Sequence, residues 1–455
     1  MFNSFRQPPA SCAAIQGSRL HHFYITVKAK FSLVLALATC WMLLSIFLAE
    51  PWFTDLSNIT GPWLAAYLIG FIAIIPGFMN AFVLGSLLVD RRPPHKQDHT
   101  YPPITILVAA YNEEDGIHDT LISLQLQDYP APMKILVLDD GSSDHTAQIV
   151  KQLSSEIADL QLVRFENNRG KSHALNIGLE QTTTNLLITV DGDCYVKRDG
   201  VRNLVERFLS DPPNTAAVAG EMLIRNSRQN WITKAQEWDY FLGIAATKRI
   251  QSLFRGTLVA QGAFSLYDRR IIESIGGWSH TVGEDIVLTW KLLDAGYRVG
   301  HAEDACAFTR CPDTLTGFVR QRQRWSRGLI EAFKANPRIL FRPRLTTLYV
   351  WWNVAFPLID VAYTIGFIPG IVLACFGYYW IVGPMTIALL PLAAILNRAM
   401  LKASERMFSD ENLKVRQNFF GFIFYMLAYS LILQPACVLG YISELLKLRK
   451  SWGTK

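Results

Sequence analysis

Four long apolar stretches constrain the fold of this 455-residue chain more than any other feature. They occupy residues 31–48, 63–89, 348–396 and 419–446. An α-helix needs roughly 20 apolar residues to cross a bilayer, and each stretch is near or above that length. We therefore expect transmembrane helices, with two spans in the third stretch and one in each of the others. The first stretch begins about thirty residues into the chain and the second follows almost at once, which is not the pattern of a signal peptide.

Basic residues beside these stretches predict the orientation in the membrane, because positive charge favours the cytoplasmic side. Four precede the first stretch and three follow the second: Arg6, Arg19, Lys28, Lys30, Arg91, Arg92 and Lys96. The segment between the second and third stretches is therefore predicted to be cytoplasmic. Towards the carboxy terminus, residues 398–416 and 447–450 are both basic. Either one of these two segments breaks the rule, or an interfacial helix is present, and the sequence leaves this open.

The cytoplasmic segment has the pattern of an α/β domain. Predicted strands at residues 104–110, 134–138 and 160–165, and a fourth beginning at residue 186, alternate with predicted helices. This alternation indicates a doubly wound, mostly parallel sheet, in which ligands bind beyond the carboxyl ends of the strands. Seven singly scattered cysteines indicate neither a disulfide framework nor a zinc ribbon. A basic patch with interleaved aromatic residues, typical of nucleic-acid binding, is also missing from the sequence.

Two aspartates end the fourth predicted strand. The unbroken apolar run from residue 186 stops at Asp191, Gly192 and Asp193. Two carboxylates separated by one glycine can hold a hard divalent cation, and the glycine lets a phosphate approach the backbone. Asp-Gly is also a common hairpin turn, so a plain surface turn is the alternative.

The neighbouring strand ends carry further candidates. Asp139 and Asp140 follow the second strand and could cap a helix, or could accept a hydrogen bond from a nucleotide base. Tyr111, after the first strand, offers a ring for stacking. Lys171 lies in a loop after Gly170 and could contact a phosphate as a point charge, although an exposed loop lysine often has no such role.

Glu284 and Asp285 precede an amphipathic helix predicted at residues 286–295. Acidic residues are favourable in the first turn of any helix, so this pair could be structural, or it could supply a general base.

A basic helix precedes the third apolar stretch. Within residues 318–333, Gln321, Arg324 and Trp325 are spaced i, i+3 and i+4, which places them on one helical face. We assign Arg324 to a pyrophosphate. Such a helix could also lie on an anionic membrane surface, and we expect Arg322 and Arg327 to do so.

These motifs together resemble the processive inverting glycosyltransferases of family 2, which include hyaluronan, chitin, cellulose and poly-β-1,6-N-acetylglucosamine synthases. The resemblance covers roughly residues 100–345, and the membrane segments are also in the family's order. It is carried by Asp139-Asp140-Gly141, Asp191-Gly192-Asp193, Gly283-Glu284-Asp285 and Gln321-Arg322-Gln323-Arg324-Trp325. The layout is most similar to that of the bacterial poly-N-acetylglucosamine synthases.

The resemblance implies a GT-A fold in the cytoplasmic part of a bacterial inner-membrane protein. We expect a cytosolic segment at residues 1–30, two transmembrane helices in 31–90, the GT-A domain in 100–312, interfacial helices with the Gln-x-x-Arg-Trp motif in 313–345, about three transmembrane helices in 347–446 and a basic tail in 447–455.

It also implies roles for the candidate residues. Asp191 and Asp193 would hold Mg²⁺ or Mn²⁺, Asp285 would be the catalytic base, and Glu284 and Trp325 would bind the acceptor. The UDP-sugar donor, most simply UDP-N-acetylglucosamine, would contact Tyr111, Glu113, Asp139, Asp140, Lys171, Asp191, Gln321 and Arg324. The partners implied are a growing polysaccharide, the bilayer and a small membrane accessory subunit, but no nucleic acid.

Two alternatives belong to other classes. A non-processive glycosyltransferase that acts on a membrane lipid shares several of these motifs. A membrane scaffold with a decayed transferase domain is the other alternative, and the intact carboxylates argue against it.

Overall fold

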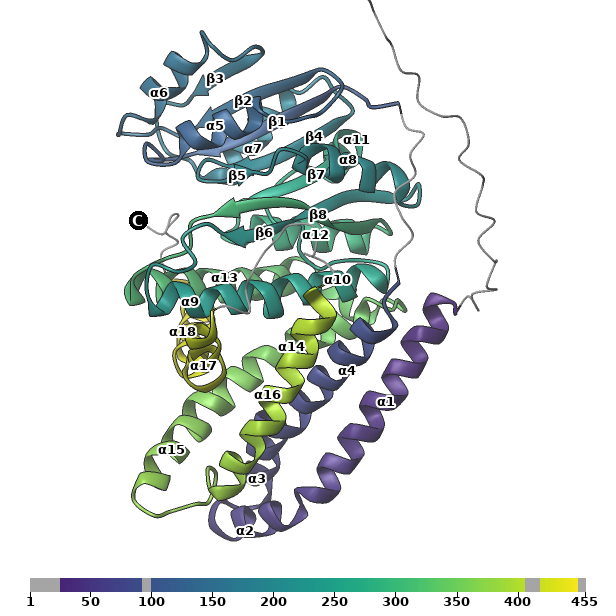
Figure 1. Ribbon diagram of the computed structural model, residues 1–455, viewed down its shortest axis with the longest axis vertical. Helices are drawn as coiled ribbons and strands as arrows, with labels where there is room; N and C mark the ends of the chain where they lie inside the picture. Colours follow the sequence, from purple (N-terminus) through teal and green to yellow (C-terminus); the bar gives the residue numbers. More distant parts are fainter. Residues whose placement is uncertain (1–24, 92–99, 406–417, 449–455) are drawn as a thin grey trace, which may run out of the picture.

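An eight-stranded sheet forms the centre of the upper part of the molecule (Figure 1). The computed structural model describes residues 25–91, 100–405 and 418–448. The strand order is β3-β2-β1-β4-β7-β6-β8-β5. The strands are β1 (Ile104–Ala110), β2 (Met133–Asp139), β3 (Leu160–Arg164), β4 (Leu186–Asp191), β5 (Tyr195–Val196), β6 (Thr215–Ile224), β7 (Phe264–Asp268) and β8 (Arg298–Thr309).

The sheet is mostly parallel, as predicted. β1 runs parallel to β2 and β4, β2 runs parallel to β3, and β6 runs parallel to β8, whereas β7 is antiparallel to both β4 and β6. Apolar residues cover both faces of the first strands, which is why their sequences do not alternate. The register pairs Ala110 with Asp139 and Ala109 with Asp191, so the carboxyl ends of β1, β2 and β4 meet at one edge.

Helices cover both faces of this sheet. They are α5 (Ile117–Gln125), α6 (Thr146–Leu153), α7 (Lys171–Glu180), α8 (Gly200–Ser210), α9 (Trp231–Trp238), α10 (Ala246–Leu253), α11 (Arg269–Ser274), α12 (Glu284–Asp294) and α13 (Leu315–Ala335), with a π-helical turn η2 (Asp239–Ala245) between α9 and α10 and a 3₁₀ turn η3 (Pro337–Phe341) after α13. The α9, α10 and α13 helices form a layer between the sheet and the lower helices (Figure 1).

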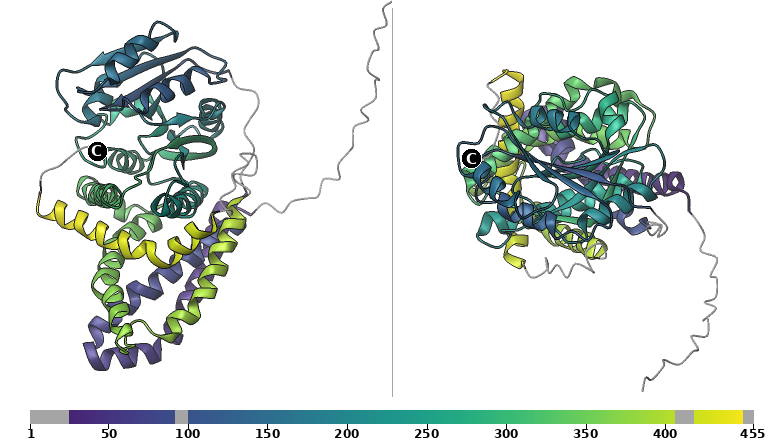
Figure 2. Two further views of the ribbon diagram at one scale, coloured as in Figure 1. Left: turned by 60° about the vertical axis from the view of Figure 1, so that its left-hand side comes forward. Right: turned by 90° about the horizontal axis from the view of Figure 1, so that it is seen from above.

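The lower part consists of long apolar helices. The first group is α1 (Val27–Leu48), α2 (Glu50–Thr60), α3 (Pro62–Ile69), η1 (Gly70–Ile74) and α4 (Ile75–Val89); the second is α14 (Thr347–Ala362), η4 (Tyr363–Phe367), α15 (Ile368–Cys375), α16 (Pro384–Glu405), α17 (Phe419–Phe424), η6 (Tyr425–Tyr429) and α18 (Ser430–Leu445). Among the described residues, four helical segments are long and apolar enough to span a bilayer: Val27–Leu48, Pro62–Val89, Thr347–Cys375 and Phe419–Leu445. The segment from α17 to α18 lies across the others, beneath the sheet domain (Figure 2).

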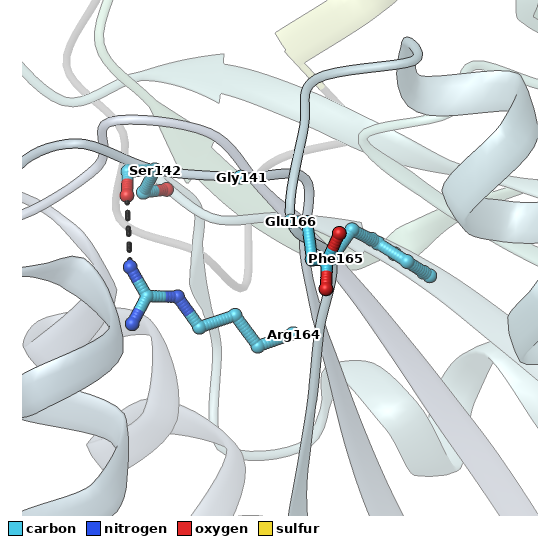
Figure 3. A pocket seen from close by; sticks show the side chains of 5 residues that line it. All are labelled: Gly141, Ser142, Arg164, Phe165 and Glu166. Carbon is cyan, nitrogen blue, oxygen red and sulfur yellow. Dashed lines mark hydrogen bonds between the residues drawn. The ribbon is translucent and has the colours of Figure 1, made fainter.

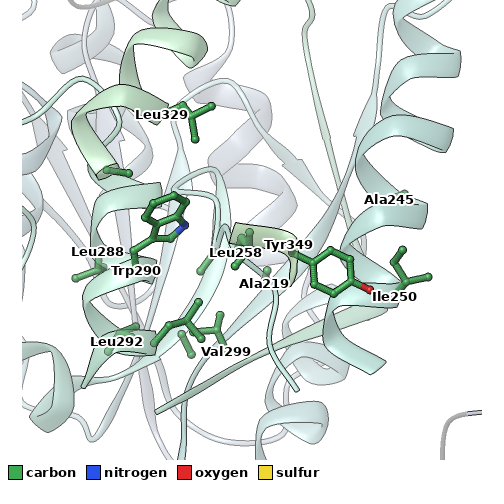
Figure 4. Packing of buried hydrophobic residues seen from close by; sticks show 14 of the residues in the cluster. Ala219, Ala245, Ile250, Leu258, Leu288, Trp290, Leu292, Val299, Leu329 and Tyr349 are labelled. Carbon is green, nitrogen blue, oxygen red and sulfur yellow. The ribbon is translucent and has the colours of Figure 1, made fainter. Parts of the chain in front are cut away.

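The sheet domain and the membrane helices share a hydrophobic core. Tyr349 of α14 and Trp290 of α12 are fully buried and belong to one cluster with Ile250 of α10 (Figure 4). Phe82 of α4 packs edge-on against Tyr349, with ring centroids 6.1 Å apart. Most of the expected amino-terminal segment and basic tail, and the basic residues Arg6, Arg19, Arg92 and Lys96, lie outside the described residues.

Candidate active site

Carboxylates and one lysine converge at the edge where β1, β2 and β4 end. Lys171 is the first residue of α7, and its Nζ donates to Oδ1 of Asp191 at the end of β4. The same Nζ lies 3.7 Å from Oε1 of Glu284 at the start of α12. Burial alone would lower the pKa of Lys171, but Asp191 and Glu284 raise it above its ordinary value, so the ammonium stays charged.

Asp193 lies beside this group. Its Oδ2 accepts a hydrogen bond from Oγ1 of Thr309 at 3.2 Å, and burial together with the nearby Asp191 raises its pKa. Asp193 is close to α5, because a Cβ on Gly116 would be 3.0 Å from its Cα. Glu113 also borders this motif, since a Cβ on Gly192 would approach its Cγ to 3.2 Å.

These residues are compatible with a divalent cation. Mg²⁺ is usually held by one or two carboxylates together with substrate phosphates and water. Asp191 and Asp193 supply two carboxylates, and the raised pKa of Asp193 indicates a position where added positive charge is favourable. The described residues contain no group of three or more His, Cys, Asp or Glu that could hold a metal.

Asp139 and Asp140 are both buried and both engaged within the protein. Asp139 accepts from the Ser142 N–H at 3.0 Å and pairs with Nε of Arg164 at 3.3 Å. Asp140 accepts from the N–H groups of Arg169 and Gly170 at 3.0 and 2.7 Å. Neither residue caps α6, whose N-cap residue is His145. Asp140 therefore fixes the loop that directly precedes Lys171, which is a structural role that the sequence did not indicate.

A pocket of about 280 Å³ adjoins Asp139. It is lined by Gly141, Ser142, Arg164, Phe165 and Glu166, and Nη2 of Arg164 donates to the Ser142 carbonyl at 3.2 Å (Figure 3). Tyr111 lies in the loop that follows β1, and its side chain is 40% exposed. The last three lining residues were not predicted as site residues, although their position at the end of the strand predicted at residues 160–165 was the available signal.

The first turn of α12 brings the acidic pair to the same edge. Oδ2 of Asp285 accepts from the Gly262 N–H at 3.5 Å. Burial raises the pKa of Glu284 to about 8; the Lys171 ammonium opposes this effect, and the Asp285 carboxylate adds to it. Gly262 is close to both groups, because a Cβ there would lie 2.7 Å from Nζ of Lys171 and 3.3 Å from Oε1 of Glu284.

Helix α13 holds this turn in place. Oε2 of Glu331 accepts from the N–H groups of Val282 and Gly283 at 2.7 and 3.0 Å. The two helices touch at Gly283 and Gly328, where a Cβ on Gly328 would lie 2.8 Å from the Gly283 Cα. Sequence reasoning missed Glu331 and Gly328, because their role depends on a contact between distant segments.

The Gln-x-x-Arg-Trp motif lies on α13 as predicted. Gln321 is buried and its Oε1 has no hydrogen-bond partner within residues 25–91, 100–405 and 418–448. Arg324 is half-buried and Trp325 is 40% exposed. The Trp325 ring lies 6.4 Å from the ring of Tyr240, on η2.

The expectation that Arg322 and Arg327 face the membrane surface is wrong. Arg322 is buried, pairs with Oδ2 of Asp239 at 2.9 Å and stacks over the Trp325 ring at 4.1 Å. Arg327 is also buried, and its Nε donates to Oε2 of Glu444 on α18 at 2.9 Å. Both guanidinium groups are paired with carboxylates inside the protein, so neither is available to bind lipid head groups.

Comparisons with known proteins agree with this geometry. Residues 105–276 match the family described as glycosyl transferase family 2. A poly-beta-1,6-N-acetyl-D-glucosamine synthase from Staphylococcus aureus (strain MSSA476) is 32% identical over 270 residues, which are 57% of this chain and 64% of that protein. A protein of the same name from Staphylococcus epidermidis is 30% identical over 295 residues, covering 62% of this chain and 71% of that protein. The chain thus spans 64% of the length of the Staphylococcus aureus relative.

A solved structure shares the fold. Mannosyltransferase PcManGT from Pyrobaculum calidifontis, in complex with GDP-Man and Mn²⁺, aligns with a TM-score of 0.57 at 21% identity, over 85% of this chain and 100% of that one. The sheet and the helices that cover it have the GT-A fold. The chain belongs to glycosyl transferase family 2.

Proposed function

We propose that the protein polymerises UDP-N-acetylglucosamine into a β-linked polysaccharide and couples this synthesis to export. The observation that carries the proposal is the meeting of Lys171, Asp191 and Glu284 with Asp285 at one edge of the sheet. The choice of sugar and polymer is supported by the names of the relatives from both Staphylococcus species.

The reaction is a single displacement with Asp285 as the base. The acceptor hydroxyl oxygen attacks the anomeric carbon of the donor from the side opposite to UDP. A new carbon–oxygen bond forms, the bond to the β-phosphate oxygen breaks, and the hydroxyl proton passes to Asp285. One displacement inverts the configuration, so an α-linked donor gives a β-linked product. Glu284, beside the Lys171 ammonium, would contact the acceptor.

The other charged residues would stabilise the leaving group. UDP gains negative charge as its bond breaks, and the Lys171 ammonium is positioned to offset that charge. Arg324 would bind the pyrophosphate and Gln321 would orient it. Mg²⁺ or Mn²⁺ held by Asp191 and Asp193 would supply further positive charge at the diphosphate. The nucleoside would bind near Tyr111, Glu113 and the pocket beside Asp139.

Trp325 would serve as the floor for the acceptor sugar. Its indole is 40% exposed, on the helix layer between the sheet and the membrane helices. A polymer end held there has a short path towards these helices. The catalytic domain would face the cytoplasm at a bacterial inner membrane, and a small membrane subunit would be a further partner.

Labelled sugar transfer by the full-length protein in membranes tests this proposal. We expect radiolabel from UDP-N-acetylglucosamine, but much less from UDP-glucose, in material retained by a size filter. Asp285→Asn serves as the inactive control. Label that is extracted entirely into organic solvent would replace the polymerase with a transferase that acts on a membrane lipid. Failure to release UDP from any UDP-sugar would contradict the proposed reaction itself.

A further inference from the structure

The segment from α17 to α18 is apolar enough to span a bilayer, but its contacts tie both of its ends to the catalytic domain. It runs from Phe419 to Leu445 and has 27 residues, a length of about 40 Å at 1.5 Å per residue. The hydrocarbon core of a bilayer is about 30 Å thick. A spanning helix of this length would therefore have its two ends on opposite sides of the membrane.

The amino-terminal end is bonded to α9. Nε1 of Trp238 donates to the carbonyl oxygen of Asn418 at 2.9 Å, and Nδ2 of Asn418 donates to the Lys234 carbonyl at 2.8 Å. Asn418 is buried and caps α17 through the Gly421 N–H. This end is therefore fixed to the helix layer directly beneath the sheet.

The carboxy-terminal end is bonded to α13 in the same layer. Glu444 is buried and accepts from Nε of Arg327 at 2.9 Å and from Nζ of Lys334 at 2.8 Å. Between the two ends, the Tyr429 hydroxyl donates to Oδ2 of Asp239 at 2.9 Å, and Ser326 donates to the Cys437 carbonyl at 3.0 Å. The domain-facing side is thus held by polar contacts along its whole length.

The opposite side is apolar and exposed. Phe420 is 78% exposed and Leu445 is 67% exposed, and Leu427, Leu439, Ile442 and Leu446 are exposed as well. A helix that has polar contacts on one side and exposed apolar residues on the other is expected to lie at the boundary between lipid head groups and acyl chains. Figure 2 shows the segment lying crosswise to α1 and α16, which is the orientation that such a position requires.

We propose that the α17–α18 segment does not cross the membrane but lies on its cytoplasmic leaflet, with its exposed apolar side inserted into the lipid. The carboxy-terminal region then has two spans, formed by α14–α15 and by α16. The described basic residues Arg398 and Lys402 of α16 and Lys447 after α18 then lie towards the catalytic side, in agreement with the positive-inside rule. The proposal concerns the orientation of the α17–α18 segment relative to the bilayer, and it does not depend on which sugar the enzyme transfers.

Accessibility of introduced cysteines tests the orientation in the full chain. In Phe419→Cys and Leu448→Cys, a membrane-impermeant maleimide should label the new cysteine in inverted vesicles and not in intact spheroplasts. Tyr378→Cys, in the turn between α15 and α16, is the control and should label from the outside only. The parent protein corrects for labelling of native cysteines. Labelling of Phe419→Cys and Leu448→Cys from opposite sides would overturn the proposal.

Depth measurements give a second test that does not require labelling from water. Spin labels at Phe420→Cys, Leu439→Cys and Ile442→Cys should show similar, shallow depths from their relative accessibility to oxygen and to a water-soluble nickel chelate. A spanning helix would instead show a depth that passes through the centre of the bilayer along this series. Release of UDP by each variant confirms that the protein has folded.

Discussion

At the scale of single residues, the charged edge contains one lysine between carboxylates from β4 and α12. Lys171 contacts Asp191 and is 3.7 Å from Glu284. Asp285 accepts hydrogen bonds from backbone N–H groups, from Ile286 at 2.7 Å and from Gly262 at 3.5 Å. The two acidic residues at the start of α12 therefore have different surroundings: Glu284 lies beside the buried lysine, and Asp285 is bonded to backbone N–H groups, so we propose Asp285 as the base.

Asp285→Asn should keep donor binding and lose catalysis. The amide has the shape of the carboxylate but cannot accept the proton, so turnover should fall by roughly 10² to 10⁴, whereas UDP-sugar affinity should change only a few-fold. Steady-state kinetics and equilibrium binding measure the two effects. Normal turnover in Asp285→Asn, combined with loss of turnover in Glu284→Gln, would move the base by one residue.

Asp193→Asn should abolish transfer in the folded protein, because it removes one of two carboxylates that would hold the cation. Chelation with EDTA should have the same effect on the parent, and added Mn²⁺ or Mg²⁺ should restore the parent but not the variant. Full activity of the parent in excess chelator would disprove the metal assignment. Unchanged thermal unfolding serves as the control for folding.

Lys248 on α10 should make stability depend on pH. It is 8% exposed, and burial lowers its pKa from 10.5 to about 8, against the opposing effects of Glu221 and Asp285. Below about pH 8 both the folded and unfolded forms carry the proton, and the folded form bears the full cost of a buried charge. Between about pH 8 and 10.5 the folded form loses the proton first, so the free energy of unfolding should rise with pH.

Lys248→Met removes this titration. We expect a higher melting temperature than the parent below pH 8, and a difference between the two proteins that shrinks as the pH approaches 10.5. Other groups titrate in the same range, so the difference between the proteins is the quantity to measure. A difference that does not change with pH would mean that Lys248 is not buried as a cation.

At the scale of elements, α12 and α13 are joined at a glycine contact that sets the position of Asp285. A Cβ on Gly328 would lie 2.8 Å from the Gly283 Cα, so Gly328→Ala should force the two helices apart. Overpacking of this kind costs about 1–3 kcal/mol, and a shift of about 1 Å at a reacting group can lower the rate about 10²-fold. The melting temperature and the turnover rate of Gly328→Ala should both be lower than those of the parent.

Gly70→Ala is the matched control for that change. Gly70 has helical backbone angles, and a Cβ there meets nothing within 4 Å. We expect Gly70→Ala to leave stability and turnover near those of the parent. Equal effects of the two substitutions would show that the contact between Gly283 and Gly328 does not position the site.

The elements that the sequence predicted best are those with a strong local signal. The prediction of residues 104–110 coincides with β1, and the runs that became β2 and β4 were found because uninterrupted Val, Ile and Leu suit a strand covered on both faces. The strands β6 and β8 were not predicted. Both contain buried polar residues, including Glu221 and His301 at 0% exposure, which pair with each other at 2.9 Å.

The candidate site was predictable to a similar degree. Asp191, Lys171, Glu284 and Asp285 could be found because strand ends and helix starts place such residues at one edge. The burial of Arg327 could not be foreseen, since its partner Glu444 is 117 residues further along the chain. A basic helix next to a membrane segment looks the same in sequence whether its guanidinium groups face lipid or an internal carboxylate.

At the scale of the whole molecule, the catalytic domain and the membrane helices share one core. Phe254, the C-cap residue of α10, packs against Phe31 of α1 and Phe82 of α4, with ring centroids 5.1 and 5.8 Å apart. The motif on α13 is held between this core and α18. We therefore expect the acceptor floor to act in chain growth more than in the cleavage of the donor.

Trp325→Ala should impair polymer formation more than hydrolysis of the donor to free sugar and UDP. Stacking on an indole contributes roughly 1 kcal/mol, enough to hold a chain end between additions. Arg324→Ala removes a contact to the leaving group and should lower both reactions. The ratio of retained polymer to free sugar measures the difference, and an identical ratio in both variants and the parent would contradict this division of roles.

The bonds between α13 and α18 also bear on the order in which the protein folds during its own synthesis. Proteins fold largely from the amino terminus as the ribosome advances. The sheet, the carboxylates and α13 are all made before residues 418–448, yet Arg322 and Arg327 take partners from that last segment, Tyr429 and Glu444. Arg322 already has Asp239 as its carboxylate partner, but Arg327 would lack Glu444, and a buried guanidinium without its carboxylate is strongly destabilising. Helix α13 should therefore reach its native packing, and with it the first turn of α12, only after α18 has been translated and has packed against it.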